Sequence, residues 1–456
     1  MKFCSVTLGC KVNQYESQAI ESFLLSRGHT QAAPGEGCDA YIINTCAVTA
    51  ESVRKSRQAV RRAKKLEAGA LIAVCGCFSQ LEPSAAVPLG ADLVGGSSSG
   101  PDFALEIEKL VETRRGNSRT RDLAQSAHPP SNPTQSPAQR VCVGEEERRS
   151  ERAFGDSRTR DLAQSATTKT RALLKIQDGC DNFCAYCVIP FARGRARSLP
   201  VAPAADQASQ LGRQGFREIV VTGIEISSYG TDLADSPPLT RVVREIGAAA
   251  PNARLRLGSL DPGSVTGAFC RELSDIPNLC GHFHLSLQSG CDDTLRRMGR
   301  KYDTGAAREA ILALRRMFPD CGITADLITG FPGETGAEFE QTLAFIKSAA
   351  FSDMHIFPFS PRPGTRAADM PEQVVKSERR ERAGVAAAAA AEMARDFRLS
   401  QIGKTVGVLF ERERGGYWIG HSGNYMEVAV KNGGKRNSLR NVLITGIKDG
   451  LVLGEI

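Results

Sequence analysis

The chain lacks any apolar run long enough to cross a bilayer. A membrane span needs about 20 consecutive apolar residues, and the longest apolar stretches, 68–78 and 383–391, are far shorter. The first ten residues also lack the apolar core of a secretory signal peptide. We therefore expect a cytoplasmic protein with no membrane partner.

The chain also lacks the composition of a disordered protein or of a disulfide miniprotein. Apolar residues make up 41% of its 456 residues, which is ample for packed cores. At about 150 residues per domain, this length indicates about three domains. The formal charge is 58 − 51 = +7, and the excess lies in residues 113–170 (net +4) and 399–456 (net +3). Basic segments of this kind are a weak indication of a polyanionic partner.

The pattern of apolar residues divides the chain into four segments. Residues 1–112 alternate short apolar runs (3–8, 40–43, 71–74 and 91–94) with helical stretches (13–27, 50–66 and 101–112), which predicts a parallel α/β domain of the flavodoxin or Rossmann type. Residues 113–170 contain a twelve-residue repeat, at 116–127 and 155–166. Two copies are too few for a solenoid, and the polar composition favours a disordered linker over a basic RNA-binding arm.

The second half of the chain predicts two further domains. Residues 171–398 hold six strand-like runs separated by helical patterns, which indicates a partial (β/α)6 barrel with its chemistry at the carboxyl ends of the strands. The six runs are 172–177, 219–223, 254–258, 282–287, 323–328 and 354–359. Residues 399–456 alternate β-forming residues with glycine turns, which predicts a small β-barrel.

Fourteen cysteines are many for a reducing compartment, so some of them are expected to bind metal. Cys180, Cys184 and Cys187 form a C-x3-C-x2-C loop after the first strand of the predicted barrel. Three thiolates on one loop suit a 4Fe-4S cluster with one open iron. Structural zinc is the alternative, but it requires four ligands and no fourth Cys or His lies nearby in sequence.

Three further cysteines, Cys10, Cys46 and Cys77, each follow a predicted strand of the first domain. Ligand sites of open parallel sheets collect at the carboxyl ends of the strands. The topology therefore favours a second three-thiolate cluster site over three unrelated buried thiols. The remaining thiols show no metal-binding spacing and are expected to be ordinary buried groups; they include Cys142, Cys270, Cys280, Cys291 and Cys321.

The cysteine loop after the first barrel strand resembles that of the radical SAM superfamily. The signatures TLGCKVNQYES, INTCAVT and CGCFSQ, joined to that loop, are similar to the methylthiotransferase family, and most similar to its branch that acts on N6-threonylcarbamoyladenosine in tRNA. This resemblance implies two 4Fe-4S clusters, S-adenosylmethionine as radical source and methyl donor, and a C-terminal TRAM-like domain that binds the tRNA anticodon stem–loop.

The same resemblance implies a reaction and a set of site residues. A deoxyadenosyl radical would activate C2 of the modified adenine at tRNA position 37, and the cluster on Cys10, Cys46 and Cys77 would supply sulfur. Ser259, Gln288 and Asp326 end later strands and are candidate cofactor contacts or, equally, polar caps of turns. The other candidate cofactor contacts are Tyr186, Gly223 and Glu225, although Ile224 replaces the middle glycine of the superfamily's Gly-Gly-Glu motif.

Several alternatives and partners complete the sequence-based predictions. Three arginines after the cysteine loop, Arg193, Arg195 and Arg197, are candidates for phosphate contacts or a solvated loop. The expected partners are tRNA and an electron donor such as flavodoxin or ferredoxin, acting on a monomer. The alternative functions are methylthiolation of isopentenyladenosine or of a ribosomal protein, a non-catalytic iron–sulfur RNA-binding protein, and a zinc protein.

Overall fold

The computed structural model describes the backbone of residues 1–124, 140–141 and 170–456, and the side chains of 1–116 and 170–456. The chain forms two compact units. The first unit contains Met1–Gln164 together with Val188–Gly194, and the second contains Ser165–Cys187 and Arg195–Ile456. Most of the predicted linker, including the second copy of its repeat, lies outside the described residues, so its predicted disorder stays a prediction.

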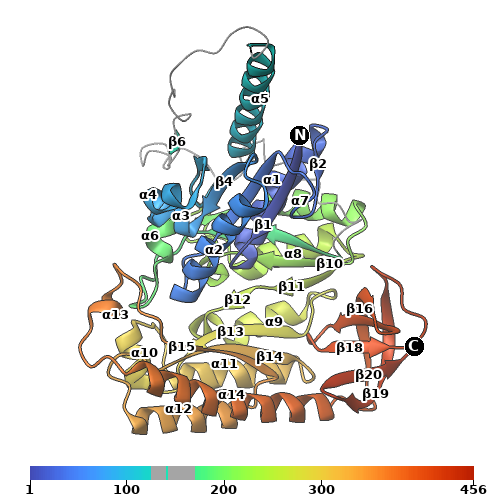
Figure 1. Ribbon diagram of the computed structural model, residues 1–456. Coiled ribbons are helices and arrows are strands. Elements are labelled where there is room, and N and C mark those ends of the chain that lie inside the picture. Colours follow the sequence, from blue (N-terminus) through green and yellow to red (C-terminus); the bar gives the residue numbers. More distant parts are fainter. Residues whose placement is uncertain (125–139, 142–169) are drawn as a thin grey trace. The chain divides into compact units, whose positions relative to one another are not determined.

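A six-stranded sheet forms the centre of the first unit, in the order β2-β1-β3-β4-β5-β6. Every pair of neighbouring strands is parallel, which confirms the predicted α/β class. Strand β3 pairs with β1 on one side and with β4 on the other, and Figure 1 labels β1 and β4. The strands are β1 (Lys2–Thr7), β2 (Thr30–Gln31), β3 (Ala40–Thr45), β4 (Leu71–Gly76), β5 (Leu93–Val94) and β6 (Arg140–Val141). The two-residue strands β2 and β6 were not predicted.

The helices of the first unit follow the strands, as the alternating pattern predicts. Helix α2 begins with a capping box between Thr49 and Ser52, which satisfies free N–H groups of its first turn. Helix α5 continues to Ala124, beyond the predicted start of the linker at residue 113. The helices are α1 (Lys11–Ser26), α2 (Ala50–Leu66), α3 (Cys77–Leu81), α4 (Pro83–Ala86), η1 (Val87–Leu89), α5 (Pro101–Ala124) and α6 (Ile189–Arg193).

The second unit contains the six predicted parallel strands, but their hydrogen-bonded ladder is divided into two sheets. The first sheet has the order β11-β10-β7 and the second β12-β13-β14-β15, and the division falls at Gly258, between β11 and β12. These strands are β7 (Arg171–Lys175), β10 (Glu218–Thr222), β11 (Arg254–Leu257), β12 (Ser259–Leu260), β13 (His282–Gln288), β14 (Gly322–Thr329) and β15 (Asp353–Pro358).

Helices alternate with these strands, and α11, α12 and α14 line one side of the second sheet in Figure 1. Strands β8 (Gln177–Asp178) and β9 (Arg197–Ser198) form a short antiparallel pair on either side of the cysteine loop. The helices are α7 (Val201–Arg213), η4 (Ile226–Ser228), α8 (Leu239–Ala249), η5 (Pro262–Ser264), α9 (Gly267–Ser274), α10 (Asp292–Met298), α11 (Thr304–Met317), α12 (Gly336–Ala349), α13 (Arg366–Asp369) and α14 (Lys376–Leu399).

The C-terminal segment forms a closed five-stranded barrel in the order β16-β17-β18-β20-β19, drawn in red in Figure 1. Its strands are β16 (Thr405–Arg414), β17 (Tyr417–Ser422), β18 (Glu427–Val430), β19 (Leu439–Lys448) and β20 (Leu451–Glu455). Strand β17 was not predicted. The turn between β16 and β17 uses Gly415 and Gly416, both at positive φ, the conformation that a tight hairpin of this kind requires.

A cluster of buried charges joins this barrel to the amino ends of β7, β10 and β11. Glu218 of β10 is fully buried and pairs with Arg254 at 2.6 Å and Arg256 at 2.8 Å. The two guanidinium groups also donate to the carbonyl oxygens of Gly407, His421, Ser422 and Gly423 in the C-terminal barrel. Burial alone would raise the pKa of Glu218, but the two arginines outweigh it and hold the pKa at about 2. The C-terminal barrel therefore packs at the end of the strands opposite to the carboxyl ends.

No helix in the described part of the chain is both long enough and apolar enough to cross a bilayer.

Candidate functional site

Three thiols meet at the carboxyl edge of the first unit's sheet. Cys10 caps α1 after β1, Cys46 follows β3, and Cys77 is the first residue of α3 after β4. Because these strands are adjacent and parallel, their carboxyl ends lie along one edge of the sheet. Cys77 interacts electrostatically with both Cys10 and Cys46, and Cys10 interacts with Cys46. The structure thus brings together the three thiols that the sequence singled out.

Two glycines allow this approach. Gly9 and Gly76 have φ values of +100° and +98°, in the region that favours glycine. A Cβ on Gly9 would lie 2.9 Å from Cys46 Cβ, and a Cβ on Gly76 would lie 2.4 Å from the carbonyl oxygen of Thr45. A side chain at either position would therefore push apart the loops that carry the cysteines.

A buried ionic network supports this thiol triad. Arg193 of α6 donates to both carboxylate oxygens of Glu16, at 2.6 and 3.0 Å, and to Asn13 Oδ1 at 2.8 Å. Asn13 Oδ1 also accepts the thiol of Cys10 at 3.6 Å. Arg193 is only 2% exposed, so the prediction that it contacts phosphate is wrong: its partner is a carboxylate of the same unit. Desolvation raises the thiol pKa values of Cys10 and Cys77, and this guanidinium offsets part of that rise.

The chemistry of this triad fits an iron–sulfur cluster. Burial raises the pKa of Cys77 to about 12, so a thiolate there needs a strong positive partner, and soft thiolates suit iron–sulfur centres. Among residues 1–116 and 170–456, no three Cys, His, Asp or Glu side chains surround a point that a single metal ion could occupy. A cubane does not need such a point, because each thiolate binds a different iron.

The second thiol triad lies on the loop that follows β8. Gly179 and Phe183 both have positive φ, at 71° and 46°, and they fold the loop tightly around Cys180 and Cys184. The backbone N–H of Asn182 donates to Cys180 Sγ at 3.5 Å. Arg300 donates to Cys184 Sγ at 3.2 Å. Backbone and guanidinium donors to sulfur stabilise thiolates, so this loop also fits a cluster.

Arg300 is a site residue that the sequence did not single out. Its side chain is 5% exposed and pairs with Asp261 at 2.7 Å, and its guanidinium lies 4.9 Å from the centre of the Tyr302 ring. The hydroxyl of Tyr302 donates to the carbonyl oxygens of Ser286 and Leu287 at the end of β13. These contacts hold a cation against the thiol of Cys184.

Gln177 connects the cysteine loop to the predicted Gly223–Glu225 motif. Its Oε1 accepts the N–H groups of Ile224 and Glu225 at 3.0 and 2.9 Å, and its Nε2 donates to the carbonyl oxygen of Gly179 at 2.8 Å. A Cβ on Gly223 would lie 2.9 Å from Gln177, which explains a glycine at this position. Burial raises the pKa of Glu225 to about 7, and Asp261 adds to the rise.

Of the other predicted cofactor contacts only Gln288 ends a strand, whereas Ser259 and Asp326, also expected at strand ends, begin β12 and lie inside β14. Tyr186 packs edge-on against Phe331, with ring centres 6.4 Å apart. Gln288 ends β13 with φ at +64°, an uncommon conformation for a non-glycine residue. Ser259 begins β12 and is half-buried. Asp326 of β14 pairs with His284 of β13 at 3.2 Å, so its carboxylate already has a partner in the protein.

The remaining predictions concern two arginines after the cysteine loop and the five thiols expected to be ordinary buried groups. Arg195 is exposed and pairs with Asp181 at 2.6 Å, and Arg197 lies 3.8 Å from Asp178. The thiols expected to be ordinary are free and buried at Cys270, Cys280, Cys291 and Cys321, whereas Cys142 lies outside the residues whose side chains are described.

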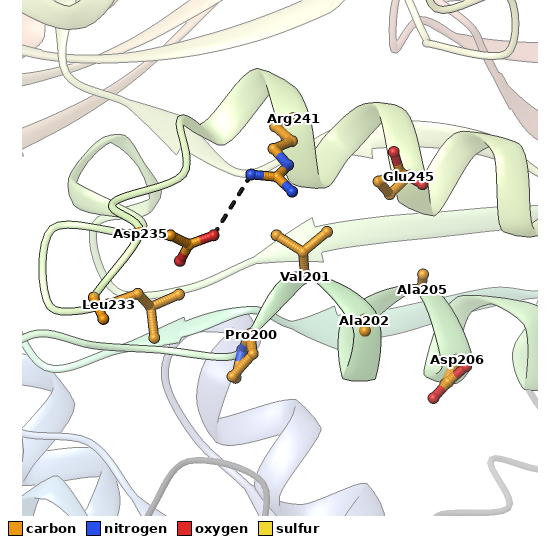
Figure 2. A pocket seen from close by; sticks show the side chains of 10 residues that line it. Pro200, Val201, Ala202, Ala205, Asp206, Leu233, Asp235, Arg241 and Glu245 are labelled. Carbon is orange, nitrogen blue, oxygen red and sulfur yellow. Dashed lines mark hydrogen bonds and ion pairs between the residues drawn. The ribbon is translucent and has the colours of Figure 1, made fainter.

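A cavity of about 570 Å³ lies elsewhere in the second unit, between the start of α7 and α8. Figure 2 shows Arg241 above it, paired with Asp235 at 3.5 Å, and Val201 and Ala202 of α7 below. None of the predicted site residues lines this cavity. The cavity therefore belongs to neither thiol triad.

Two known protein families match parts of this chain, and a solved structure shares its fold. The Radical SAM superfamily matches residues 174–346, and the Uncharacterized protein family UPF0004 matches residues 2–94. A radical S-adenosylmethionine methyltransferase from Kitasatospora setae, solved with cobalamin and a 4Fe-4S cluster, has a similar fold. Its TM-score is 0.51 at 15% identity, with 80% of this chain and 77% of that chain covered.

The curated relatives cover most of the chain. The threonylcarbamoyladenosine tRNA methylthiotransferase MtaB of Bacillus subtilis is 33% identical over 93% of this chain and 89% of its own length. The protein of the same name from Thermotoga maritima is 35% identical over 89% and 85%. The tRNA-2-methylthio-N(6)-dimethylallyladenosine synthase of Oleidesulfovibrio alaskensis is 32% identical over 90% and 83%. With identity above 30% over nearly its whole length, this chain belongs to the radical SAM tRNA methylthiotransferase family.

Proposed function

We propose that the protein methylthiolates C2 of N6-threonylcarbamoyladenosine at position 37 of tRNA, giving the 2-methylthio derivative. Relatives named for this substrate are 33% and 35% identical to the chain. The observation that carries the proposal is the meeting of Cys10, Cys46 and Cys77 at one edge of the sheet, because insertion of sulfur requires a second sulfur-binding centre in addition to the one that generates the radical.

The side chains around the two triads have distinct roles in this proposal. Cys180, Cys184 and Cys187 would hold a 4Fe-4S cluster with S-adenosylmethionine, which would supply the radical and, from a second molecule, the methyl group. Cys10, Cys46 and Cys77 would hold the second 4Fe-4S cluster. Gln177 fixes the cysteine loop against Glu225, whose carboxylate would bind the methionine ammonium, and Tyr186, Gly223, Ser259, Gln288 and Asp326 would complete the cofactor site.

The partners follow from the substrate. We assign RNA binding to the C-terminal β-barrel, in a domain arrangement of 1–112, a 113–170 linker, 171–398 and 399–456. Since the substrate is tRNA, the protein acts in the cytoplasm, as a monomer that receives electrons from a flavodoxin or ferredoxin. Bases of an anticodon loop can be unstacked and held in a pocket, which suits chemistry at a base edge.

Two triple variants test the two clusters. After anaerobic purification, Cys10→Ala/Cys46→Ala/Cys77→Ala and Cys180→Ala/Cys184→Ala/Cys187→Ala are each expected to keep about half of the wild-type iron and sulfide, because each keeps one cubane. The first variant should form 5′-deoxyadenosine from S-adenosylmethionine but no methylthiolated tRNA, and the second should form neither product.

The matched control is Cys75→Ala, which removes a buried thiol two residues from Cys77 and should keep all the iron. Full iron content and methylthiolation in the Cys10/Cys46/Cys77 variant would contradict the second cluster. Mass spectrometry of nucleosides from tRNA of cells lacking the protein identifies the substrate. Loss of the 2-methylthio group from dimethylallyladenosine instead would support the branch represented by the Oleidesulfovibrio relative.

The raised pKa of Glu225 predicts pH-dependent cofactor binding. The carboxyl group must be ionised to bind an ammonium group, and its pKa of about 7 leaves it mostly protonated at pH 6. We therefore expect the affinity for S-adenosylmethionine to fall about tenfold between pH 8 and pH 6. Equilibrium binding across this range measures the effect. Glu225→Gln should bind weakly with no such dependence, and an unchanged pH profile in this variant would exclude the role.

A further inference from the structure

Helix α2 carries an unusual concentration of positive charge. Its 17 residues include seven Lys and Arg but only one acidic residue, Glu51. Helix α14, which is longer, contains six basic and four acidic residues and is therefore nearly balanced. The seven basic residues of α2 are Arg54, Lys55, Arg57, Arg61, Arg62, Lys64 and Lys65; we call them the α2 basic face.

These charges occupy one side of the helix. The opposite side is buried against the sheet through Val53, Ser56, Val60 and Ala63. Arg54 and Lys55 share Glu51 as a partner, and Arg57 pairs with Glu82 at 3.0 Å. Arg61, Arg62 and Lys65 are exposed, and no acidic group in the described part of the chain pairs with them. A face that leaves several cations unneutralised attracts polyanions.

The α2 basic face is fixed to the thiol triad of the same unit. Ser56, on the buried side between Lys55 and Arg57, accepts the N–H of Cys46 at 3.1 Å and donates to the Cys46 carbonyl oxygen at 3.2 Å. The N-cap Thr49 follows Cys46 by three residues. The helix thus starts at the edge of the sheet where the three cysteines meet, and Arg61, Arg62 and Lys65 lie in its last two turns, about 18–24 Å along the axis from Thr49.

The helix geometry favours a nucleic acid over a lipid surface. A helix that lies in a membrane interface inserts its apolar side between lipids, but the apolar side of α2 already packs against the protein core. Most of the exposed residues of α2 are charged, and Arg and Lys are the side chains that most often contact phosphate oxygens of nucleic acids. The substrate class of this family provides such a backbone.

We propose that the α2 basic face, centred on Arg61, Arg62 and Lys65, binds the phosphate backbone of the tRNA. This inference rests on the proposed function, because that function identifies the bound polyanion as tRNA. It adds a docking surface in the first unit to the RNA-binding role assigned to the C-terminal barrel.

Charge reversal with a matched control tests this surface. Arg61→Glu/Arg62→Glu/Lys65→Glu changes the net charge by −6, and Lys376→Glu/Arg380→Glu/Arg395→Glu makes the same change on exposed positions of α14. Equilibrium binding of full-length tRNA to each holoenzyme is measured between 50 and 300 mM salt. Each lost phosphate contact should reduce the slope of log K against log salt by about 0.7–0.9.

We expect the α2 variant to bind tRNA at least about tenfold more weakly at low salt, with a slope smaller by about 2. Its iron content and its 5′-deoxyadenosine formation without tRNA should equal those of the wild type. Equal losses in the α14 variant, or unchanged binding in the α2 variant, would overturn the proposal. The proposal would also be overturned if charge reversal on α2 left tRNA binding intact and abolished only binding to vesicles that contain phosphatidylserine. A wild-type holoenzyme that binds no tRNA would instead refute the proposed function.

Discussion

Replacing Glu218 by Gln is expected to lower the free energy of unfolding of the second unit by about 3–5 kcal/mol. Glu218 is fully buried between Arg254 and Arg256, and the amide would leave both guanidinium groups without an anionic partner. Trp418, the only tryptophan of the chain, lies in β17 of the C-terminal barrel. Its fluorescence during urea unfolding should therefore report the loss directly.

The same carboxylate predicts how this stability depends on pH. Its pKa is lowered from 4.5 to about 2 in the folded state, so its contribution is complete above pH 4.5 and is lost as the pH falls toward 2. The wild type should lose stability across this window, and Glu218→Gln should lose much less. The control is Glu427→Gln, which removes an exposed pair with Arg412 and should cost less than about 1 kcal/mol. Equal losses in the free energy of unfolding for Glu218→Gln and Glu427→Gln would contradict the buried position of Glu218.

Replacing Arg193 by Met is expected to have a comparable effect on the first unit. The substitution leaves Glu16 buried without its guanidinium partner, which costs about 3–5 kcal/mol. It also removes a positive charge that limits the desolvation-driven rise of the thiol pKa values of Cys10 and Cys77. In the Cys180/Cys184/Cys187 triple-alanine background, where only the second cluster remains, we expect loss of most iron and a lower melting temperature.

Two comparisons separate charge from packing at Arg193. Arg193→Lys keeps the positive charge and should retain more iron than Arg193→Met, although it loses the bidentate contact with Glu16. Arg195→Met changes a side chain that is 84% exposed and should alter neither iron content nor melting temperature. If Arg193→Met keeps full iron and a wild-type paramagnetic resonance spectrum, Arg193 does not support the thiol triad.

Strong local patterns made most of the fold predictable. The apolar runs of β3 and β4 were found because buried parallel strands are nearly continuous in hydrophobicity. The barrel strands were found although some alternate, as in RLRL of β11, or are mostly exposed, as in β15. Strands β2 and β6 contain only two residues each, too few for a periodic pattern. Strand β17, with the sequence YWIGHS, carries a glycine and polar residues that weaken a strand pattern. The division of the barrel sheet at Gly258 depends on tertiary packing, which local sequence does not encode.

The candidate site was predictable only where chemistry is concentrated in short motifs. The spacing C-x3-C-x2-C grouped Cys180, Cys184 and Cys187, whereas the positions of Cys10, Cys46 and Cys77 after parallel strands, together with the family signatures, grouped the other three. The role of Arg193 was not predictable, because its partner Glu16 lies 177 residues away in sequence. Gln177 and Arg300 were missed for the same reason: their contacts with Glu225 and Cys184 span 48 and 116 residues.

The seven residues Val188–Gly194 belong to the first unit although they follow the last cysteine of the loop in the second. The first unit is therefore discontinuous along the polypeptide, and no single cut separates it from the rest. A fragment that stops before the barrel would lack α6 and with it Arg193, leaving the carboxylate of Glu16 uncompensated. A gene fusion that exchanges the N-terminal half between relatives therefore has a constraint. The exchanged half must be accompanied by a compatible version of the short insert Val188–Gly194.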